Sequence, residues 1–236
     1  MDLAAALRGV VRRPQPWPEP EPGPWRSARF SVVDLETTGL DLRRDEVISL
    51  GVVTVSGGRL QSDRWHQVVR PSRPISPESV KVHALTPDEV AEAPPLEDVL
   101  GAVRARLRGT VLVAHAAWVE RAFLDRALRS RRERLPDEVV DTAALARAAG
   151  LVEAGSYEPD LESLARRLGL PVHTPHHALG DAVTTAQVLL VLVARLEATA
   201  GRALDVRDLV RLTRRHPLGE PGPDGNRPGD ADVPSP

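Results

Sequence analysis

Cysteine is absent from this chain, and aromatic side chains make up only 3% of it. The lack of cysteine excludes structural disulfides, zinc–thiolate sites and a cysteine nucleophile. Because aromatic residues are scarce, a hydrophobic core must be built mainly from valine, leucine and alanine, for which the 42% hydrophobic content is sufficient. The 236 residues are enough for one substantial domain or two small ones.

Long hydrophobic runs are also missing. No uncharged stretch reaches the ~18 residues that a membrane span requires, and the longest apolar run lies near residues 186–194. The first residues place Asp2 directly after Met1 and do not form a basic segment followed by an apolar one, so no secretory signal is predicted. We therefore expect a cytoplasmic protein that does not enter a membrane.

The chain has no excess of basic charge. Its formal net charge is −2, which argues against a general polyanion binder. The balance favours an enzyme that binds a few nucleotides in a cleft over a protein that coats long duplexes. Neither G-x-G-x-x-G nor G-x-x-x-x-G-K-[ST] occurs, which argues against a nucleotide-cofactor enzyme.

Both ends of the chain differ in composition from its middle. Residues 1–13 could form a short helix, and residues 14–24 hold six prolines among eleven positions, which predicts an extended linker. The last residues are rich in proline, glycine and aspartate and are expected to be disordered. The predicted division is an N-terminal segment and linker at 1–25, a catalytic domain at 26–200, a C-terminal helix at 201–216 and a tail at 217–236.

Between these ends, the hydrophobic patterns predict an α/β fold. Strands are expected at 30–35, 47–55, 59–69, 110–114 and from 139, with a hairpin turn at Gly57 and Gly58. Helices are expected at 77–83, 87–92, 96–107, 118–132, 142–149, 160–168, 178–199 and 205–214. Three hairpin-like strands followed by alternating strands and helices predict a mixed sheet of about five strands, the first three antiparallel, flanked by helices.

Two carboxylates lie two residues apart at the end of the first predicted strand. Asp34 and Glu36 must point to the same face of the sheet, at the carboxyl end of the strand, where α/β proteins bind their ligands. The following Thr37, Thr38 and Gly39 let the chain turn close to a bound group. Taken alone, the segment could equally be an exposed acidic strand end.

A second candidate segment begins the longest predicted helix. Asp181 lies in the first turn of that helix, and His176 lies in the loop before it. An imidazole with a pKa near neutrality is a suitable general base for water attacking a phosphodiester. Alone, Asp181 could simply cap the helix. Glu120, in the first turns of the helix after the fourth strand, completes a set of four carboxylates and one histidine, which suits a site for two divalent cations.

In this order the three segments resemble the Exo I, Exo II and Exo III motifs of the DEDDh 3′→5′ exonucleases, a family that includes the epsilon proofreading subunit of bacterial DNA polymerase III. The resemblance covers roughly residues 28–197 and extends to residues 82–86, 141–146 and 161–165. It implies a ribonuclease H-like fold and two magnesium or manganese ions. It implies metal ligation by Asp34, Glu36, Glu120 and Asp181, with His176 as the general base and Thr37 near the terminal 3′-hydroxyl.

The middle segment departs from the family pattern. The family normally has His-Asn-Ala-x-Phe-Asp, whereas this chain has His115, Ala116, Ala117, Trp118, Val119 and Glu120. Glutamate keeps the charge but adds one methylene, and magnesium is strict about its octahedral geometry. We therefore expect an active enzyme that is slower and favours manganese.

The candidate substrate contacts are Thr37, Thr38, Gly39, Leu40, His83, His115 and Trp118. Trp118, His83 and Leu40 are candidates for stacking on a base, although Trp118 could equally belong to the core. The leading substrate is single-stranded DNA or a frayed 3′ end, and short RNA is the alternative, because nothing in the motifs reads a 2′-hydroxyl.

Two other classes of function stay open at this level. The chain could be an accessory subunit that docks on a polymerase or repair complex through its ends. It could also be a weakly active or inactive nucleic-acid-binding module, because of Glu120. The sequence does not specify an oligomeric state.

Overall fold

The computed structural model describes residues 13–75, 77–83, 85–152 and 159–215. Its central feature is a five-stranded sheet in the order β4-β3-β2-β5-β7. The strands are β2 (Arg29–Thr37), β3 (Val47–Ser56), β4 (Arg59–Val68), β5 (Val111–Ala114) and β7 (Val139–Asp141). Strands β2, β3 and β4 are antiparallel neighbours, whereas β5 and β7 run parallel to β2. The expected mixed sheet is therefore confirmed.

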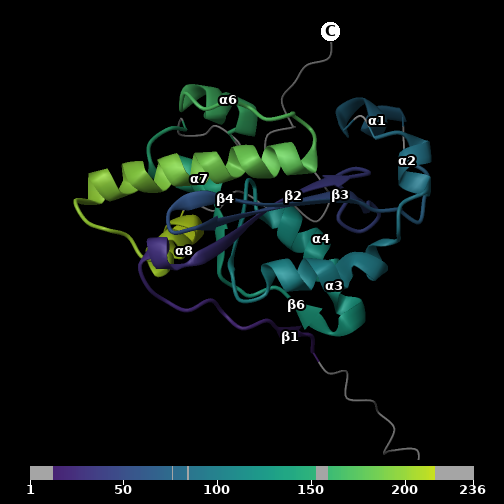
Figure 1. The fold of residues 1–236 in the computed structure, drawn as a ribbon, viewed down its shortest axis with the longest axis horizontal. Helices are drawn as coiled ribbons and strands as arrows, with labels where there is room; N and C mark the ends of the chain where they lie inside the picture. Colours follow the sequence, from purple (N-terminus) through teal and green to yellow (C-terminus); the bar gives the residue numbers. More distant parts are fainter. Residues whose placement is uncertain (1–12, 76, 84, 153–158, 216–236) are drawn as a thin grey trace, which may run out of the picture.

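Helices cover both faces of this sheet (Figure 1). They are α1 (Pro77–His83), α2 (Pro87–Ala91), α3 (Leu96–Leu107), α4 (Trp118–Leu128), α5 (Thr142–Ala148), α6 (Leu161–Arg167), α7 (Ala178–Ala200) and α8 (Val206–Arg215). Phe30 and Val32 pack toward α5, α6, α7 and α8, while Val33 and Leu35 pack toward α3 and α4. This alternation along β2 determines which face the carboxylates at its end occupy.

Most predicted elements lie within one or two residues of the observed ones. Gly57 and Gly58 have φ angles of 62° and 69° and form the predicted hairpin turn, since L-residues rarely adopt this conformation. The helix expected at 118–132 ends earlier, at Leu128. It continues as a 3₁₀ turn, η3 (Arg129–Arg131), which Arg132 closes in the left-handed conformation.

The proline-rich segment is extended, but it lies against the domain instead of standing apart from it as a linker. Its first described residues form β1 (Gln15–Pro16), which pairs with β6 (Glu133–Arg134). Trp17 is buried, with 4% of its surface exposed, and its Nε1 donates to Glu133. A tryptophan within the proline run provides apolar surface that anchors the segment. The helix expected at 1–13 and the tail at 217–236 lie outside the described residues, apart from residue 13.

The longest helix, α7, is long and apolar enough to cross a membrane by length and composition alone. In the structure it is the central helix of the core, and it packs across β2, β3 and β4. Its first turn carries Asp181. Its apolar composition is therefore explained by burial within the domain.

Candidate active site

The site begins where β2 ends. Phe30 and Val32 face α7, so Asp34 and Glu36 continue the same face at the carboxyl end of the strand. Both side chains are partly buried. The i, i+2 spacing therefore has the consequence expected from the sequence, and it directs two carboxylates toward the first turn of α7.

Close packing of α7 on β3 brings the third carboxylate to the other two. Gly51 pairs with Asp34 across the sheet, and a Cβ atom at Gly51 would lie 2.2 Å from the carbonyl oxygen of Ala178. Only glycine permits this approach of helix and strand. A Cβ atom at Gly180 would lie 2.3 Å from the carbonyl oxygen of His173, so the preceding loop is also packed directly on the helix.

As a result, carboxylate oxygens of Asp34, Glu36 and Asp181 all lie within 4.8 Å of one another. Three carboxylates at this distance repel one another unless cations or protons neutralise them. Their ligand atoms are all oxygens, which magnesium and manganese prefer. The residues present therefore fit a site for divalent cations.

The electrostatics of the site reflect its burial and this crowding. Burial and, as a smaller contribution, the charge of Asp181 together raise the pKa of Glu36 to about 7. Burial also raises the pKa of Asp181 to about 6, although the backbone N–H groups and charge of His176 oppose the shift. The pKa of Asp34 is raised well above its ordinary value by burial and then by Glu120, Asp181 and Glu36.

Glu120 lies beside this cluster. It is in the first turn of α4, with only 4% of its surface exposed, and its charge contributes to the raised pKa of Asp34. Among the described residues, it is not part of the group whose oxygens lie within 4.8 Å of one another. The structure thus places the fourth carboxylate next to Asp34 but outside the tight cluster.

The loop that precedes α4 is held by Asp141, whose role sequence reasoning missed. Ala116 adopts a φ of 60°. The backbone N–H groups of Ala116 and Ala117 donate to the Asp141 carboxylate, each at 3.1 Å, and the N–H of Ala143 donates to it at 2.8 Å. This buried aspartate links the ends of β5 and β7 to the start of α4. The sequence signal for this role was the position of Asp141 at the end of a predicted strand.

His176 lies in the loop before α7, in the left-handed conformation with a φ of 57°. Its side chain is 60% exposed, and its Nε2 lies 3.8 Å from Glu162 Oε1 of α6. The adjacent His177 stacks on His66 of β4, with ring centroids 4.4 Å apart, and His66 is hydrogen bonded to Ser49. Glu162 and His66 are supporting residues that sequence reasoning missed, because they are remote in sequence.

The turn after β2 is fixed by hydrogen bonds within the loop. Thr38 donates to Asp45 at 2.9 Å, and Thr37 donates to the carbonyl of Gly39 at 2.7 Å. A Cβ atom at Gly39 would lie 2.5 Å from the Asp45 carboxylate, so a larger residue there would displace the Asp45 side chain. Leu40 is the one large hydrophobic residue that is exposed among the described residues, at 52%. The predicted contacts Thr37, Thr38, Gly39 and Leu40 therefore form one rigid turn beside the carboxylates.

Two of the predicted substrate contacts are occupied inside the protein. His83 is buried; its Nδ1 accepts from the N–H of Leu85, and its Nε2 is bonded to Ser79. The ring nitrogens of His115 contact Thr142 Oγ1 at 2.9 Å and the carbonyl oxygen of Pro159 at 2.6 Å. These contacts use the ring nitrogens of both histidines to hold α1 and the chain before α6. A contact of His83 or His115 with substrate stays a prediction. Trp118 packs partly against Ala116 and Ala143.

Comparisons with known proteins place the chain in a family. Residues 31–189 match the family described as Exonuclease. The exonuclease match covers strands β2 to β5 and β7 and continues into α7, so it includes all four carboxylates and His176. The chain is 36% identical over 174 residues to a PolC-type DNA polymerase III of Thermotoga maritima, covering 72% of this chain and 12% of that protein. It is 33% identical over 168 residues to the epsilon subunit of DNA polymerase III of Treponema pallidum, covering 70% and 76%.

Solved structures show the same fold. Exonuclease X in complex with 5′ overhanging duplex DNA superposes with a TM-score of 0.60 and 27% identity, over 78% of this chain and 99% of that one. Exonuclease I of E. coli in complex with a dT13 oligonucleotide gives a TM-score of 0.61 at 13% identity, over 74% and 43%, which shows the fold alone. The chain therefore belongs to the exonuclease family, as a DEDDh-type member of the epsilon-like group.

Proposed function

We propose that this protein is a metal-dependent 3′→5′ exonuclease that hydrolyses the terminal phosphodiester of single-stranded DNA or of a frayed 3′ end and releases nucleoside 5′-monophosphates. The observation that carries the proposal is the cluster of Asp34, Glu36 and Asp181, with oxygens within 4.8 Å of one another. Such a cluster is unfavourable without a cation, and in this family fold it lies at the sheet edge where ligands bind.

In this proposal, Asp34, Glu36 and Asp181 hold two divalent cations, either Mg²⁺ or Mn²⁺, together with Glu120. When bound, the cations make a water more acidic and neutralise the leaving 3′-oxygen. The turn of Thr37 to Leu40 positions the terminal nucleotide: Thr37 is placed for the 3′-hydroxyl and Leu40 for an apolar contact with a base.

His176 is the proposed general base. Its Nε2 lies 3.8 Å from Glu162 Oε1, and we assign Nδ1 as the nitrogen that accepts the proton from the attacking water. Because His176 is exposed on a loop whose neighbour His177 is stacked on His66, the ring has access to water while the backbone is held.

The names of the relatives support DNA as the substrate and a replication or repair setting. Two of them are DNA polymerase III proteins, and the structure of Exonuclease X contains DNA. We propose that this protein also acts on DNA in the cytoplasm, alone or as part of a polymerase or repair complex. The PolC-type relative is far longer than this chain, so association with a polymerase is a separate hypothesis.

The direct test is degradation of a 5′-labelled single-stranded DNA, beside an RNA of the same sequence, with magnesium, manganese or EDTA. A metal-dependent ladder that shortens from the 3′ end and disappears with Asp34→Ala is expected. The ratio of the DNA and RNA rates identifies the substrate. Absence of any ladder with either metal, from a preparation that is folded, would refute the proposal and favour a binding module.

A further inference from the structure

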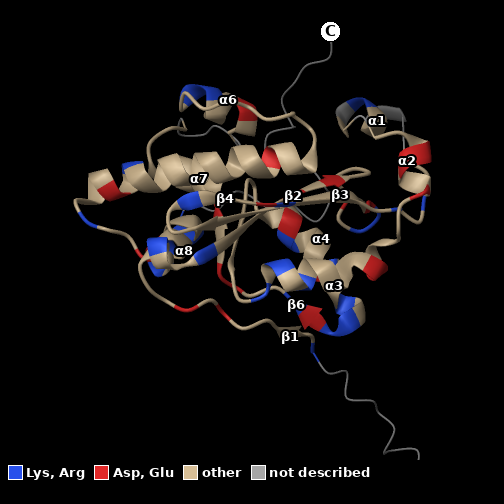
Figure 2. Ribbon diagram, in the orientation of Figure 1, with Lys and Arg blue, Asp and Glu red and all other residues tan. Residues whose placement is uncertain are grey.

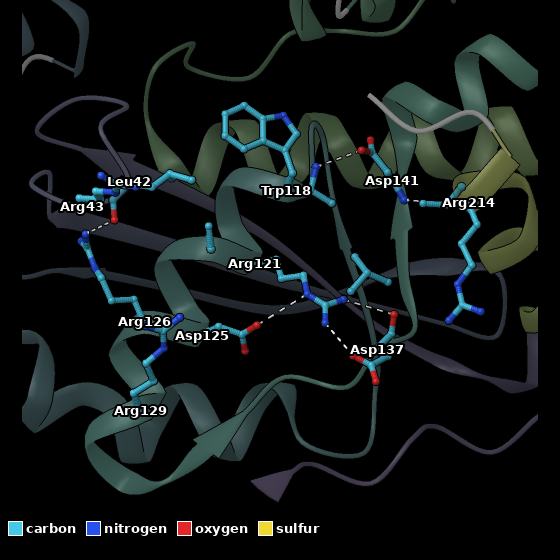
Figure 3. A pocket seen from close by; sticks show the side chains of 14 residues that line it. Leu42, Arg43, Trp118, Arg121, Asp125, Arg126, Arg129, Asp137, Asp141 and Arg214 are labelled. Atoms are coloured by element: carbon cyan, nitrogen blue, oxygen red, sulfur yellow. Dashed lines mark hydrogen bonds and ion pairs between the residues drawn. The ribbon is translucent and has the colours of Figure 1, made fainter. Parts of the chain in front are cut away.

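A second feature lies at the same edge of the sheet, on the side of α4 that faces away from the carboxylates. It is a groove with a volume of about 640 Å³, which we call the α4 groove. Residues that define it include Leu42, Arg43, Trp118, Arg129, Asp137 and Arg214 (Figure 3). Its volume is within the range of ligand-binding clefts.

One end of the α4 groove adjoins the candidate active site. Leu42 and Arg43 follow the turn that holds Leu40, and Trp118 begins α4, whose first turn carries Glu120 on the opposite face of the helix. The other end is formed by β7 and by Arg214 near the end of α8. Since β2, β5 and β7 are parallel, their carboxyl ends lie on one edge of the sheet. The α4 groove therefore extends the active-site edge away from the carboxylates.

The acidic residues of the α4 groove are already used within the protein. Asp137 accepts from Arg121 at 2.9 Å and from Arg134 at 2.7 Å. Asp125 accepts from the N–H of Leu135 at 2.7 Å, and Asp141 binds the amides before α4. Asp137 is thus neutralised by arginines, whereas Asp125 and Asp141 are held in place by backbone amides; with five arginines against three aspartates, the lining of the groove stays basic.

Two arginines of the groove are also committed. Arg121 is paired with Asp137, and Arg126 donates to the carbonyl oxygens of Leu42 and Asp45, which fixes the loop after β2 to α4. In contrast, Arg43, Arg129 and Arg214 are exposed. No carboxylate in the described part of the chain lies within 4.0 Å of these three guanidinium groups. They are the cations available to a ligand.

The arrangement of these arginines defines the kind of ligand. In Figure 3, Arg43 and Arg129 lie on one side and Arg214 on the opposite side, with Trp118 and the Arg121–Asp137 pair between them. Figure 2 also shows basic residues in the turn after α4, beside β6, and on α8. Separated guanidinium groups along a groove match the repeating negative charge of a phosphodiester backbone, and an aromatic side chain among them suits an unpaired base.

A neighbouring cavity of about 460 Å³ continues the basic lining. It shares Arg43 and Arg126 with the α4 groove and adds Arg44, Arg70 and Arg73. Its residue Glu46 is bonded to the N–H and hydroxyl of Ser72, both at 2.5 Å. Positive charge is therefore concentrated on this side of a chain whose formal net charge is −2.

We infer that the α4 groove binds the single-stranded part of the substrate that lies 5′ to the terminal nucleotides, with Arg43, Arg129 and Arg214 contacting its phosphates. This inference rests on the proposed function, since the 3′ end of the same strand must occupy the carboxylate site. It goes beyond the proposed function because it predicts that the preferred substrate is a strand several nucleotides long. A single strand is favoured over a duplex because Trp118 can stack only on a base that is not already stacked.

The test compares a trinucleotide with a long single-stranded DNA, using the full chain and the combined variant Arg43→Gln, Arg129→Gln and Arg214→Gln. We expect the KM for the long strand to rise about tenfold or more, with kcat unchanged, because three phosphate contacts are lost. For the trinucleotide, which has only one phosphate 5′ to the scissile one and so cannot contact all three arginines, kcat/KM should change far less than for the long strand. The matched control is Arg59→Gln, Arg64→Gln and Arg195→Gln, three exposed arginines outside the groove.

Salt dependence gives a readout that a change in folding would not produce. For the long strand, the slope of log KM against log salt concentration should fall by about 2 in the groove variant, since each single-strand phosphate contact contributes about 0.7. Equal losses on both substrates, or an unchanged KM and salt slope, would overturn the inference and leave the groove to another ligand such as an acidic peptide. A larger effect on a blunt duplex than on the single strand would overturn the single-strand assignment.

Binding without catalysis separates this inference from the proposed function. Fluorescence anisotropy of a labelled long strand in EDTA measures the groove independently of hydrolysis. If the unsubstituted protein binds the strand but degrades nothing, the proposed activity fails. The groove assignment then still stands if the groove variant binds the strand more weakly than the unsubstituted protein. If degradation occurs and the groove variant binds as tightly as the unsubstituted protein, only the groove assignment fails.

Discussion

At the scale of single residues, the candidate site holds its carboxyl groups where their charged form is disfavoured. Burial is the main cause: with the charge of Asp181 it raises the pKa of Glu36 to about 7, and it raises the pKa of Asp181 to about 6. A carboxyl group whose pKa is higher in the folded state than in the unfolded state stabilises the fold below its unfolded pKa. This stabilisation is lost as the pH rises through the folded pKa. The metal-free protein should therefore become less stable between about pH 4 and pH 7.

Glu36→Gln tests this directly. At about pH 8 and in EDTA, the variant should be more stable than the unsubstituted protein by about 1–3 kcal/mol, because burial and Asp181 raise the pKa of Glu36 to about 7. The gain should shrink as the pH falls and disappear below about pH 4, where Glu36 is protonated in both the folded and the unfolded state. Thermal melting at the two pH values measures it, with the exposed Asp63→Asn as control. An equal gain at both values would show that ionisation of Glu36 is not its cause. The variant should also lose exonuclease activity.

Glu120 is the residue at which this chain departs from its family. It lies beside Asp34 but outside the tight cluster. We expect Glu120→Asp to lower the ratio of manganese-supported to magnesium-supported activity, because the shorter side chain restores the family's ligand and magnesium is the stricter of the two ions. Rates with each metal measure the ratio, and Glu120→Gln should reduce both. A ratio that does not change in Glu120→Asp would mean that Glu120 does not set the metal preference.

The sequence identified the four carboxylates and His176 because their residue types and order are local signals. It could not identify Glu162, His66 or Asp141 as supporting residues. Their contacts join strands and helices that are far apart in the chain, and a single acidic or histidine residue on an element has no distinguishing pattern. For the same reason the sequence could not show that the ring nitrogens of His83 and His115 are bonded inside the protein.

At the scale of elements, the site depends on how closely α7 approaches the sheet. Hydrophobic periodicity predicted both β3 and α7 to within about two residues, but it gives no information on the distance between them. That distance is set at Gly51, which appears in the sequence as one more residue of an apolar strand. Glycine within a strand commonly marks a close approach of another backbone.

Gly51→Ala should therefore separate the catalytic elements. Its Cβ would lie 2.2 Å from the Ala178 carbonyl oxygen, so the first turn of α7 must move and carry Asp181 away from Asp34. We expect a loss of activity of about 100-fold or more, since small misplacements at such sites have effects of this size, together with a lower melting temperature. Gly101→Ala is the matched control, because nothing lies within 4 Å of its added Cβ and alanine favours a helix by about 0.5–1 kcal/mol. Full activity in Gly51→Ala would contradict this account.

At the scale of the whole molecule, the proline-rich segment connects parts that are distant in sequence. After β1 pairs with β6, Glu19 accepts from the N–H groups of Asp137 and Glu138. Further along, the carbonyl of Gly23 accepts from Val206 at the start of α8. The prolines correctly predicted an extended chain, since they remove N–H donors and restrict φ. Composition could not predict that this segment docks on the domain, because docking depends on Trp17 packing against residues of other elements.

Trp17→Ala should show that this segment is part of the domain. The side chain is 4% exposed and donates to Glu133, so its loss should destabilise the protein by about 3–5 kcal/mol. For a protein of this size, the melting temperature should then fall by about 6–20 °C. Glu21→Ala, at an exposed position of the same segment, should change it by less than about 2 °C.

Because Trp17 contacts none of the four carboxylates, kcat measured well below the melting transition should stay within about twofold of the unsubstituted value. A melting temperature unchanged by Trp17→Ala would mean that the segment lies on the domain without stabilising it. In its effect on stability the segment would then behave like the free linker that the sequence predicts.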